Sequence, residues 1–285
     1  MYYRLCHCQP PHPAPMASFT ADSCMTQLSA MDRARISLAK LRQSIPFLKT
    51  GVDPLVLVFP HYRVAYIPIP KAANSSVKAA LLPLIGLDPS GIDDIQAFRG
   101  FRKIPYSRFA SMRTGDWYVF SVVRDPFSRY ASAYLDKVVT REIVLRGFRR
   151  MGIRKGDSFQ RFMSLQTEWP QKALNPHVIA QSTMLEDALR DGLNVFKLED
   201  LPGHWTSIAD EIRSRSGIEI GTLEQRNRGK SKIPWQSLYD AETIALARHL
   251  GAADFAMFQY EADRMGCPST QAFPMTPDYR ITANP

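Results

Sequence analysis

Two short segments of this chain combine the side chains that bind anions. Residues 70–76 contain a lysine and two serines, and residues 123–134 contain two arginines and several hydroxyls. Each segment follows a strand-like apolar stretch and precedes a stretch with helical spacing. The first N–H groups of a helix lack intrahelical partners and carry partial positive charge, so such turns favour anions. The donors expected in the first turn are Lys71, Asn74, Ser75 and Ser76.

The second segment repeats the arrangement of the first. Residues 117–123 form an apolar strand pattern, Asp125 can cap the helix that follows, and Pro126 suits its first turn. Arg124 lies at the carboxyl end of the strand, where ligands bind in open α/β sheets. Two such turns indicate one ligand with two separate anionic groups.

The elements that position these turns follow from the hydrophobic pattern. Strands are predicted over residues 55–59, 63–69, 117–123 and 194–198, and helices over residues 77–85, over residues 240–250 and after Gly203. This order favours an α/β protein with a P-loop-like three-layer α/β/α fold and a mostly parallel central sheet. The first two strands are too close for a crossover, so we expect them to form an antiparallel pair at the sheet edge.

At these residues the chain resembles the sulfotransferases, in particular sulfotransferase family 2, the carbohydrate sulfotransferase branch. The first turn of that family reads roughly Pro-Lys-x-Ala/Gly-Cys-Thr/Ser-x, and the second reads Arg-Asp-Pro-Phe-x-Arg-x-x-Ser-Ala-Tyr. Three later segments are also similar to family segments: residues 175–182, 196–201 and 254–260. The resemblance spans about residues 55–260 and implies the sulfotransferase version of the three-layer fold. We expect a soluble, bacterial-type member.

The resemblance also implies the ligand, which is the sulfuryl donor 3′-phosphoadenosine 5′-phosphosulfate. The first turn would hold the phosphosulfate and the second turn the 3′-phosphate, while a late basic loop is similar to one that contacts the 3′-phosphate in some sulfotransferases. Asn74 stands where relatives often have cysteine. The donor-binding residues carried over are Lys71, Ala72, Asn74, Ser75, Ser76, Arg124, Ser132, Arg228 and Lys230.

The implied reaction transfers a sulfuryl group to a hydroxyl of a carbohydrate or related acceptor. It requires alignment of donor and acceptor, neutralisation of the leaving phosphate and removal of the acceptor proton. Lys71 is the expected neutralising group. A histidine suits proton removal, and the resemblance places His177 near the acceptor. His61 and Glu168 are the alternatives for this acceptor side.

The chain is basic, with a formal net charge of +9. The bias is strongest over residues 141–155, where six basic residues accompany one glutamate. Arg149 and Arg150 in this segment are expected either to bind an anionic acceptor, such as a uronic-acid or sulfated glycan, or to form a solvated helix face. A neutral glycan is the other acceptor considered. No nucleic-acid-binding motif occurs, so we expect no nucleic-acid partner; nothing in the sequence indicates an oligomeric state.

Length and composition fit one catalytic domain, because 285 residues with 45% apolar content can bury a full core. The expected organisation is a flexible N-terminal extension over residues 1–30, the sulfotransferase domain over 31–265 and a tail over 266–285. Residues 31–48 show helical apolar spacing. No long apolar stretch or secretory signal occurs and there are four cysteines, so we expect a cytoplasmic protein without a transmembrane anchor. Sulfuryl donors need no bridging metal, and none is expected.

Two other function classes remain open. A nucleotide-dependent kinase of P-loop-like fold also builds a strand-loop-helix phosphate site, but it requires Gly-x-x-x-x-Gly-Lys-Ser/Thr, which this chain lacks. A non-catalytic polyanion-binding module would keep the fold without turnover. Within the second turn, Arg129 is expected to pair with Asp125 across one helical turn and to be structural.

Overall fold

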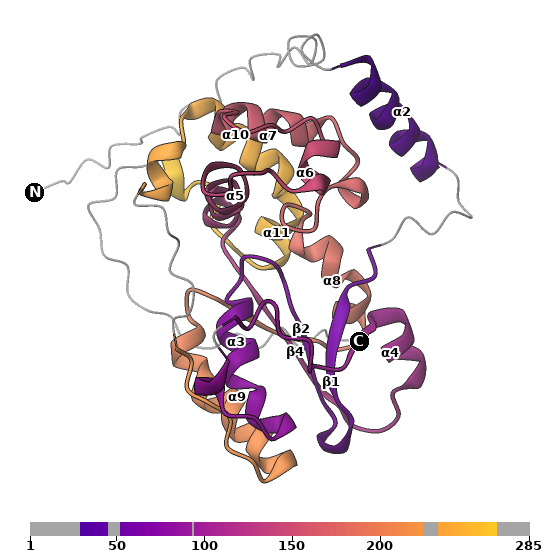
Figure 1. Ribbon diagram of the computed structural model, residues 1–285, viewed down its shortest axis with the longest axis vertical. Helices are drawn as coiled ribbons and strands as arrows, with labels where there is room; N and C mark the ends of the chain where they lie inside the picture. Colours follow the sequence, from indigo (N-terminus) through magenta and orange to yellow (C-terminus); the bar gives the residue numbers. More distant parts are fainter. Residues whose placement is uncertain (1–28, 45–51, 93, 225–232, 267–285) are drawn as a thin grey trace, which may run out of the picture.

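The computed structural model describes residues 29–44, 52–92, 94–224 and 233–266. Within these ranges the chain forms a mixed α/β structure around a five-stranded sheet with the strand order β3-β1-β2-β4-β5 (Figure 1). The strands are β1 (Leu55–Phe59), β2 (Val64–Ile67), β3 (Lys103–Pro105), β4 (Tyr118–Val123) and β5 (Asn194–Lys197).

The sheet is mostly parallel, as predicted, but not entirely so. β2, β4 and β5 pair in parallel, whereas β1 runs antiparallel to both β2 and β3. The predicted antiparallel pairing of β1 with β2 is therefore confirmed. Its predicted place at the sheet edge is wrong, because β3 extends the sheet beyond β1. The sequence pattern missed β3 because three residues ending in a proline carry no readable alternation.

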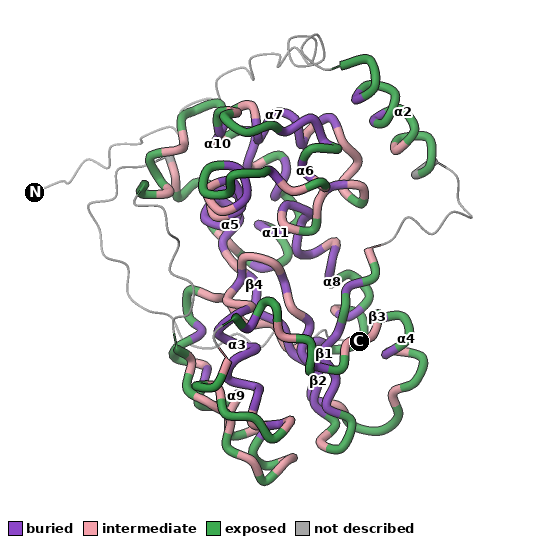
Figure 2. The backbone as a smooth tube through the Cα atoms, viewed as in Figure 1, coloured by how far each residue is buried: buried purple, intermediate pink, exposed green. Residues whose placement is uncertain are grey.

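The central strands are buried on both faces, and this explains their continuous apolar runs. Every residue of β2 and β4 is buried. The rings of Tyr66 and Phe120, on neighbouring strands, lie 5.0 Å apart between centroids. Ser121 fits this apolar layer because its hydroxyl donates to the Ile67 carbonyl at 2.7 Å. Figure 2 shows the buried backbone concentrated along these strands.

Helices surround the sheet on two sides and at one end. Figure 1 shows α3 and α9 on one side, α4 on the other, and a group containing α5, α6, α7, α10 and α11 beyond the end of the strands. The helices are α2 (Ala30–Ser44), α3 (Asn74–Ala80), α4 (Tyr106–Met112), α5 (Pro126–Tyr134), α6 (Arg146–Arg150), α7 (Phe159–Thr167), α8 (Gln181–Arg190), α9 (Leu201–Ser216), α10 (Ala241–Leu250) and α11 (Ala252–Met257). No helix within the described ranges has the length and apolar character needed to span a bilayer.

The helix predicted over residues 31–48 is present as α2 up to Ser44, and residues 45–48 lie outside the described residues. It contacts the rest of the protein through Ile36 and Asp32, which are buried, whereas Leu38 and Leu41 are exposed. Its apolar spacing therefore marks a helix with a narrow contact face.

The start of α5 also follows the sequence prediction. The Asp125 carboxylate accepts a hydrogen bond from the Ser128 N–H at 2.9 Å, and Pro126 occupies the first turn. A π-helical turn, Leu135–Val139, continues directly from the end of α5. Single π turns often occur at functional sites because they redirect side chains out of the helical register.

Candidate active site

The two predicted anion-binding turns lie side by side because β2 and β4, which lead into them, are neighbouring parallel strands. Parallel neighbours are about 4.8 Å apart. The guanidinium of Arg124 crosses this gap, since its Nη1 donates to the carbonyl oxygen of Lys71 at 3.1 Å. The structure thus brings together the two cations that the sequence assigned to one ligand.

The backbone of the first turn has an unusual conformation. Lys71 and Ala73 have positive φ angles of 73° and 49°, which side chains other than glycine rarely adopt. Such conformations cost free energy and cluster at functional sites. The side-chain oxygen Oδ1 of Asn74 is buried and has no hydrogen-bond partner in the described part of the chain. A strained turn with an unsatisfied polar atom fits a ligand-binding loop.

The other predicted residues of the first turn are more enclosed than expected. Ala72 is fully buried, and Ser75 and Ser76 are each 7% exposed. Ser75 Oγ accepts a hydrogen bond from Gln96 Nε2. A ligand would therefore meet the backbone of this turn and the side chain of Lys71 before the serine hydroxyls.

Lys71 already has a partner in the structure, Asp136 in the π-helical turn. Lys71 Nζ and Lys137 Nζ each lie 2.8 Å from Asp136 Oδ2, and Arg141 Nε lies 3.8 Å from Oδ1. Burial lowers the pKa of Lys71, and the hydrogen bond from its ammonium to Asp136 raises it in part. Burial also raises the pKa of Asp136, but the hydrogen bonds from Lys137 and Lys71 outweigh it and lower this pKa to about 2. No sequence pattern had indicated Asp136.

Arg124 is oriented by the helix that follows it. Its Nε donates to Ser128 Oγ at 2.8 Å, and Ser132 lies one turn further along the same face of α5. Burial lowers the pKa of Arg124, yet a guanidinium stays charged in proteins. Its remaining nitrogen, Nη2, makes no hydrogen bond within the described ranges. Both N–H groups of Nη2 therefore stay available to a ligand, and Ser128 is a further partner that no sequence pattern indicated.

Two distant segments fix the backbone of Arg124. Its N–H donates to Gln181 Oε1 at 2.9 Å, and Gln181 Nε2 donates to its carbonyl at 2.8 Å. Gln181 is held in turn by Asp254, which is fully buried and accepts from the Gln181 N–H at 2.8 Å and from the Ser182 N–H at 2.7 Å. The family-like segments 175–182 and 254–260 therefore support the second turn.

Arg129 does not pair with Asp125, contrary to the sequence prediction, although its role is structural. It is 1% exposed and donates to three carbonyl oxygens: from Nε to Pro70 at 3.2 Å, from Nη1 to Ile179 at 2.8 Å and from Nη2 to Pro176 at 3.3 Å. Backbone carbonyls replace a carboxylate because the guanidinium points away from its own helix. Arg129 thereby ties the first turn to the segment that contains His177.

The positive charge of Lys71 is one of several that act on the His177 ring and lower its pKa. Burial, and then the charges of Lys137, Lys71 and Arg129, lower the pKa of His177 to about 3, so the ring is neutral at neutral pH. Asn175 Oδ1 accepts from the backbone N–H of His177 at 3.0 Å and lies 2.8 Å from its Nδ1. Because this oxygen is an acceptor, Nδ1 carries the ring proton and Nε2 keeps its lone pair.

The remaining predicted residues are distributed over the molecule. His61 is exposed in the turn between β1 and β2, at the opposite end of β2 from Lys71. Glu168 is buried at the end of α7, and its carboxylate makes no hydrogen bond or ion pair within the described ranges. Arg149 and Arg150 are exposed on α6. Arg228 and Lys230 lie outside the described residues.

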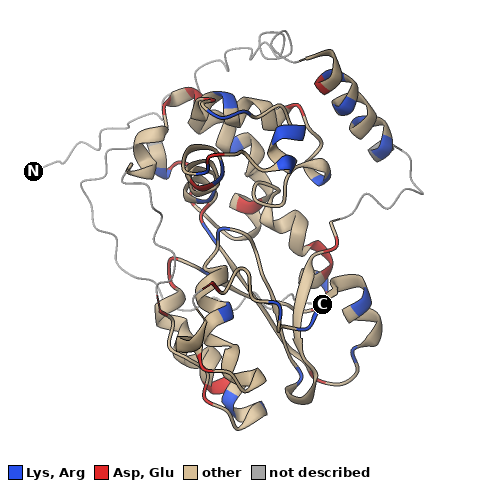
Figure 3. Ribbon diagram, in the orientation of Figure 1, with Lys and Arg blue, Asp and Glu red and all other residues tan. Residues whose placement is uncertain are grey.

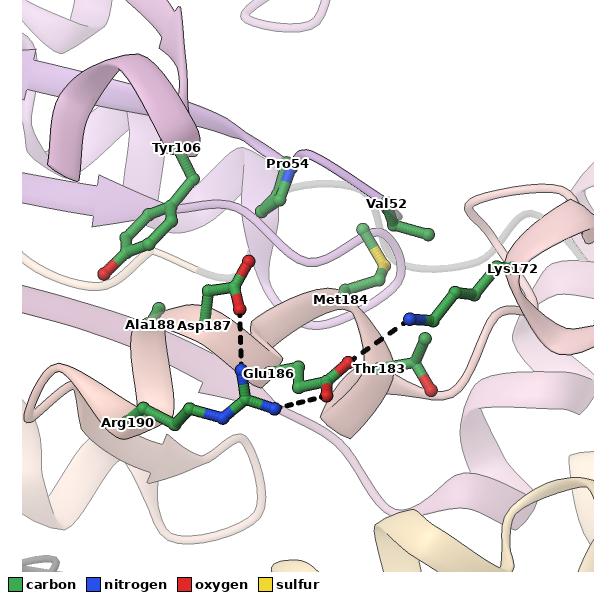
Figure 4. A pocket seen from close by; sticks show the side chains of 10 residues that line it. All are labelled: Val52, Pro54, Tyr106, Lys172, Thr183, Met184, Glu186, Asp187, Ala188 and Arg190. Atoms are coloured by element: carbon green, nitrogen blue, oxygen red, sulfur yellow. Dashed lines mark hydrogen bonds and ion pairs between the residues drawn. The ribbon is translucent and has the colours of Figure 1, made fainter. Parts of the chain in front are cut away.

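A pocket of about 230 Å³ lies elsewhere, between the start of β1, α4 and α8 (Figure 4). Its charged side chains neutralise one another, because Glu186 lies 3.5 Å from Lys172 and 2.5 Å from Arg190, and Asp187 lies 3.0 Å from Arg190. None of the predicted site residues lines it. This pocket therefore lacks the excess positive charge that a nucleotide bisphosphate requires.

Comparison with known proteins identifies the family to which this chain belongs. A sequence model described as "Sulfotransferase family", of the family 2 type, matches residues 54–261, a range that contains Lys71, Arg124 and His177. A search of curated proteins and a search of solved structures each found no match. Because the matched range covers well over half of the chain, this protein belongs to the sulfotransferase family.

Proposed function

We propose that this protein transfers a sulfuryl group from 3′-phosphoadenosine 5′-phosphosulfate to a hydroxyl of a carbohydrate or related acceptor. The observation that carries the proposal is the contact between the two turns, where Arg124 Nη1 lies 3.1 Å from the Lys71 carbonyl. Two partly buried cations at adjacent strand ends suit one molecule with two separate anionic groups. The three-layer, P-loop-like sulfotransferase fold is part of the proposal, and helices on both sides of the sheet support it.

The donor would bind across both turns. Lys71 would turn from Asp136 to the phosphosulfate, and Asp136 would keep Lys137 as its partner. Arg124 Nη2 and Ser132 would hold the 3′-phosphate, for which a guanidinium offers paired donors. Asn74 would lie beside the phosphosulfate end with its NH2 group as the donor, because the unsatisfied Oδ1 can only accept.

The chemistry requires one bond to form and one to break. The acceptor oxygen attacks sulfur, the bond from sulfur to the 5′-phosphate oxygen breaks, and adenosine 3′,5′-bisphosphate leaves with the electron pair. Lys71 neutralises the charge that develops on this leaving group. The acceptor proton passes to Nε2 of His177, which holds a lone pair.

The depressed pKa of His177 suits this role once the donor is bound. Burial, and then the charges of Lys137, Lys71 and Arg129, lower the pKa to about 3 in the free protein. The negative charges of the donor offset those cations, so donor binding raises the pKa toward the range of an effective base. Proton transfer is thereby coupled to donor binding.

A thermal-shift comparison tests the donor. We expect adenosine 3′,5′-bisphosphate to stabilise the protein and ATP with magnesium to leave it unchanged; stabilisation by ATP with magnesium alone would favour a kinase. Activity should persist with a chelator present, because the proposed chemistry uses no metal.

Two substitutions test the catalytic assignment. Lys71→Ala and Arg124→Ala should each abolish transfer of labelled sulfuryl to a mixture of glycans, and Arg124→Ala should chiefly weaken bisphosphate binding. Lys172→Ala, in the separate pocket of Figure 4, serves as the control and should keep activity. Unchanged turnover in both site variants would overturn the proposal. Bisphosphate and polyanion binding without any turnover in the wild type would instead identify a non-catalytic module.

A further inference from the structure

Outside the proposed donor site, arginine side chains gather around one open hollow. The hollow has a volume of about 460 Å³, and only arginines line it within the described ranges. They come from two parts of the chain, α2 and the segment that contains α6, which both carry dense positive charge in Figure 3. The lining residues are Arg35, Arg146, Arg149, Arg150 and Arg154.

The positive charge of this arginine hollow is largely uncompensated. Its one carboxylate partner in the described ranges is Asp32, which is buried and lies 3.2 Å from Arg35 Nη1 and 3.6 Å from Arg154 Nη2. Arg146, Arg149 and Arg150 form no ion pair with any described residue. Like charges held together without counter-charges repel one another, so an anion that binds here relieves that repulsion.

One of the arginines is fixed in place by the backbone. Arg154 Nη1 donates to the carbonyl oxygens of Arg149 at 2.8 Å and of Ile153 at 3.2 Å. Together with the contact to Asp32, these bonds join α2 to the segment after α6. Interactions within the fold therefore hold the arginine hollow in shape.

The arginine hollow lies on the far side of α6 from His177. Phe148 is fully buried on α6, and its ring centroid is 6.1 Å from that of His177. Helical periodicity places Arg146, Arg149 and Arg150 on the opposite face of the same helix. A helix with side chains is about 10 Å across, so roughly one helix width separates the arginines from the proposed base.

We propose that the arginine hollow is an exosite that binds carboxylate or sulfate groups of an acidic glycan acceptor, away from the hydroxyl that reacts. This inference rests on the proposed function. Guanidinium groups match the planar and forked geometry of such anions. Contacts with a remote part of a substrate supply binding energy that orients the reacting group. An acceptor bound in this way would cross α6, with its reacting hydroxyl on the side of His177 and its anionic groups in the arginine hollow.

The observations favour a glycan over a nucleic acid. Proteins that bind single strands stack bases on aromatic side chains, and no aromatic residue lines the hollow within the described ranges. α6 has five residues, which is too short for a helix that reads a DNA groove.

A direct binding experiment tests the exosite. Fluorescent dextran sulfate and neutral dextran of equal length are titrated with the wild type, with Arg149→Gln/Arg150→Gln, and with Arg190→Gln/Arg213→Gln. The control pair lies on α8 and α9, where both arginines are in ion pairs, and it removes the same charge. We expect the wild type to bind dextran sulfate only, the hollow variant to bind it at least tenfold more weakly, and the control within twofold of the wild type.

Two results would overturn this proposal. Equal weakening in both double variants would show that binding follows overall charge. Tighter binding of duplex DNA than of dextran sulfate, lost in the hollow variant, would assign the hollow to a nucleic acid.

The same proteins separate this inference from the proposed function. Arg149→Gln/Arg150→Gln should keep the thermal shift caused by adenosine 3′,5′-bisphosphate, which also shows that it folds. Arg124→Ala should lose that shift and keep dextran sulfate binding. If no protein responds to the bisphosphate, the proposed function fails whatever the hollow binds. If the bisphosphate shift persists and dextran sulfate binding is unchanged in the hollow variant, the exosite alone fails.

Discussion

Lys71 Nζ donates a hydrogen bond to Asp136 Oδ2 at 2.8 Å, so the lysine proposed to neutralise the donor already has an anionic partner. Lys137 lies at the same distance from the same oxygen. When Lys71 turns to a ligand, Asp136 keeps this second cation. The exchange therefore avoids leaving an unpaired charge in a partly buried site, which is the costly outcome.

The first prediction concerns this exchange. Asp136→Asn removes an anion that competes with the donor for Lys71, so adenosine 3′,5′-bisphosphate should bind more tightly. A partly exposed pair of this kind is worth up to about 1 kcal/mol, which corresponds to about fivefold in affinity. Isothermal titration calorimetry measures the change. Asp210→Asn, which breaks an exposed pair with Arg213 on α9, is the matched control. Weaker binding in Asp136→Asn would show that the aspartate helps to build the site.

The second prediction concerns the acid sensitivity caused by His177. Its pKa is lowered from 6.5 to about 3, so between these pH values the unfolded chain binds a proton that the folded protein does not. Stability contributed by the neutral ring is therefore lost as pH falls through that window. We expect the melting temperature of His177→Gln to fall less between pH 7 and pH 5 than that of the wild type.

Ligand binding should raise the pKa of His177 in the wild type and so reduce this acid sensitivity. Histidine NMR signals should show His177 neutral at pH 5 in the free protein and a raised pKa with adenosine 3′,5′-bisphosphate bound. A pKa that does not move on binding would remove the proposed coupling between the donor and the base.

The third prediction concerns the packing of α6 against the segment that holds His177. A methyl group at Gly147 would collide with Asn175 Nδ2, and the same side chain holds His177 through Oδ1. Gly147→Ala should therefore lower turnover at least tenfold while bisphosphate affinity stays unchanged.

A second glycine serves as the control for that substitution. A methyl group at Gly203 in α9 meets nothing within 4 Å. Gly203→Ala should keep activity and gain up to about 1 kcal/mol of stability from helix propensity. If both variants keep full activity, Asn175 does not position the base.

The fourth prediction concerns Lys78, a buried lysine on α3. Burial, and then the nearby charges of Lys103 and Arg99, lower its pKa to about 8. Between pH 8 and 10.5 the unfolded chain binds a proton that the folded protein lacks, so wild-type stability rises with pH across this window. Lys78→Met should melt at a higher temperature than the wild type at pH 7, and the difference should shrink by pH 10. A lower melting temperature at pH 7 would contradict this.

The sequence predicted the elements that depend on neighbouring residues. Apolar runs over residues 55–59 and 117–123 located β1 and β4, and the Asp125 cap with Pro126 located the start of α5. It could not predict interactions between side chains far apart in the chain. Lys71 and Asp136 are 65 positions apart, and no local pattern joins them.

Arg129 shows a second limit of sequence patterns. Its three partners are backbone carbonyls, which every residue has, so residue types cannot reveal the pairing. An aspartate one turn away looked like the natural partner, and the fold placed the guanidinium elsewhere. The arginine hollow is a similar case, because Arg35 joins α6 only through tertiary packing.

The pairing of β2 with β4 has a consequence for how this protein could diversify. Ile67, the last residue of β2, lies opposite Ser121 of β4, so the main chain itself sets the spacing of the two turns. No exchange of side chains alters that spacing while the sheet persists. The arginines of α6, by contrast, project from a five-residue helix beyond the strands. Descendants of one gene could acquire new acceptors by replacing that short segment, while all of them would keep the spacing that the proposed donor spans.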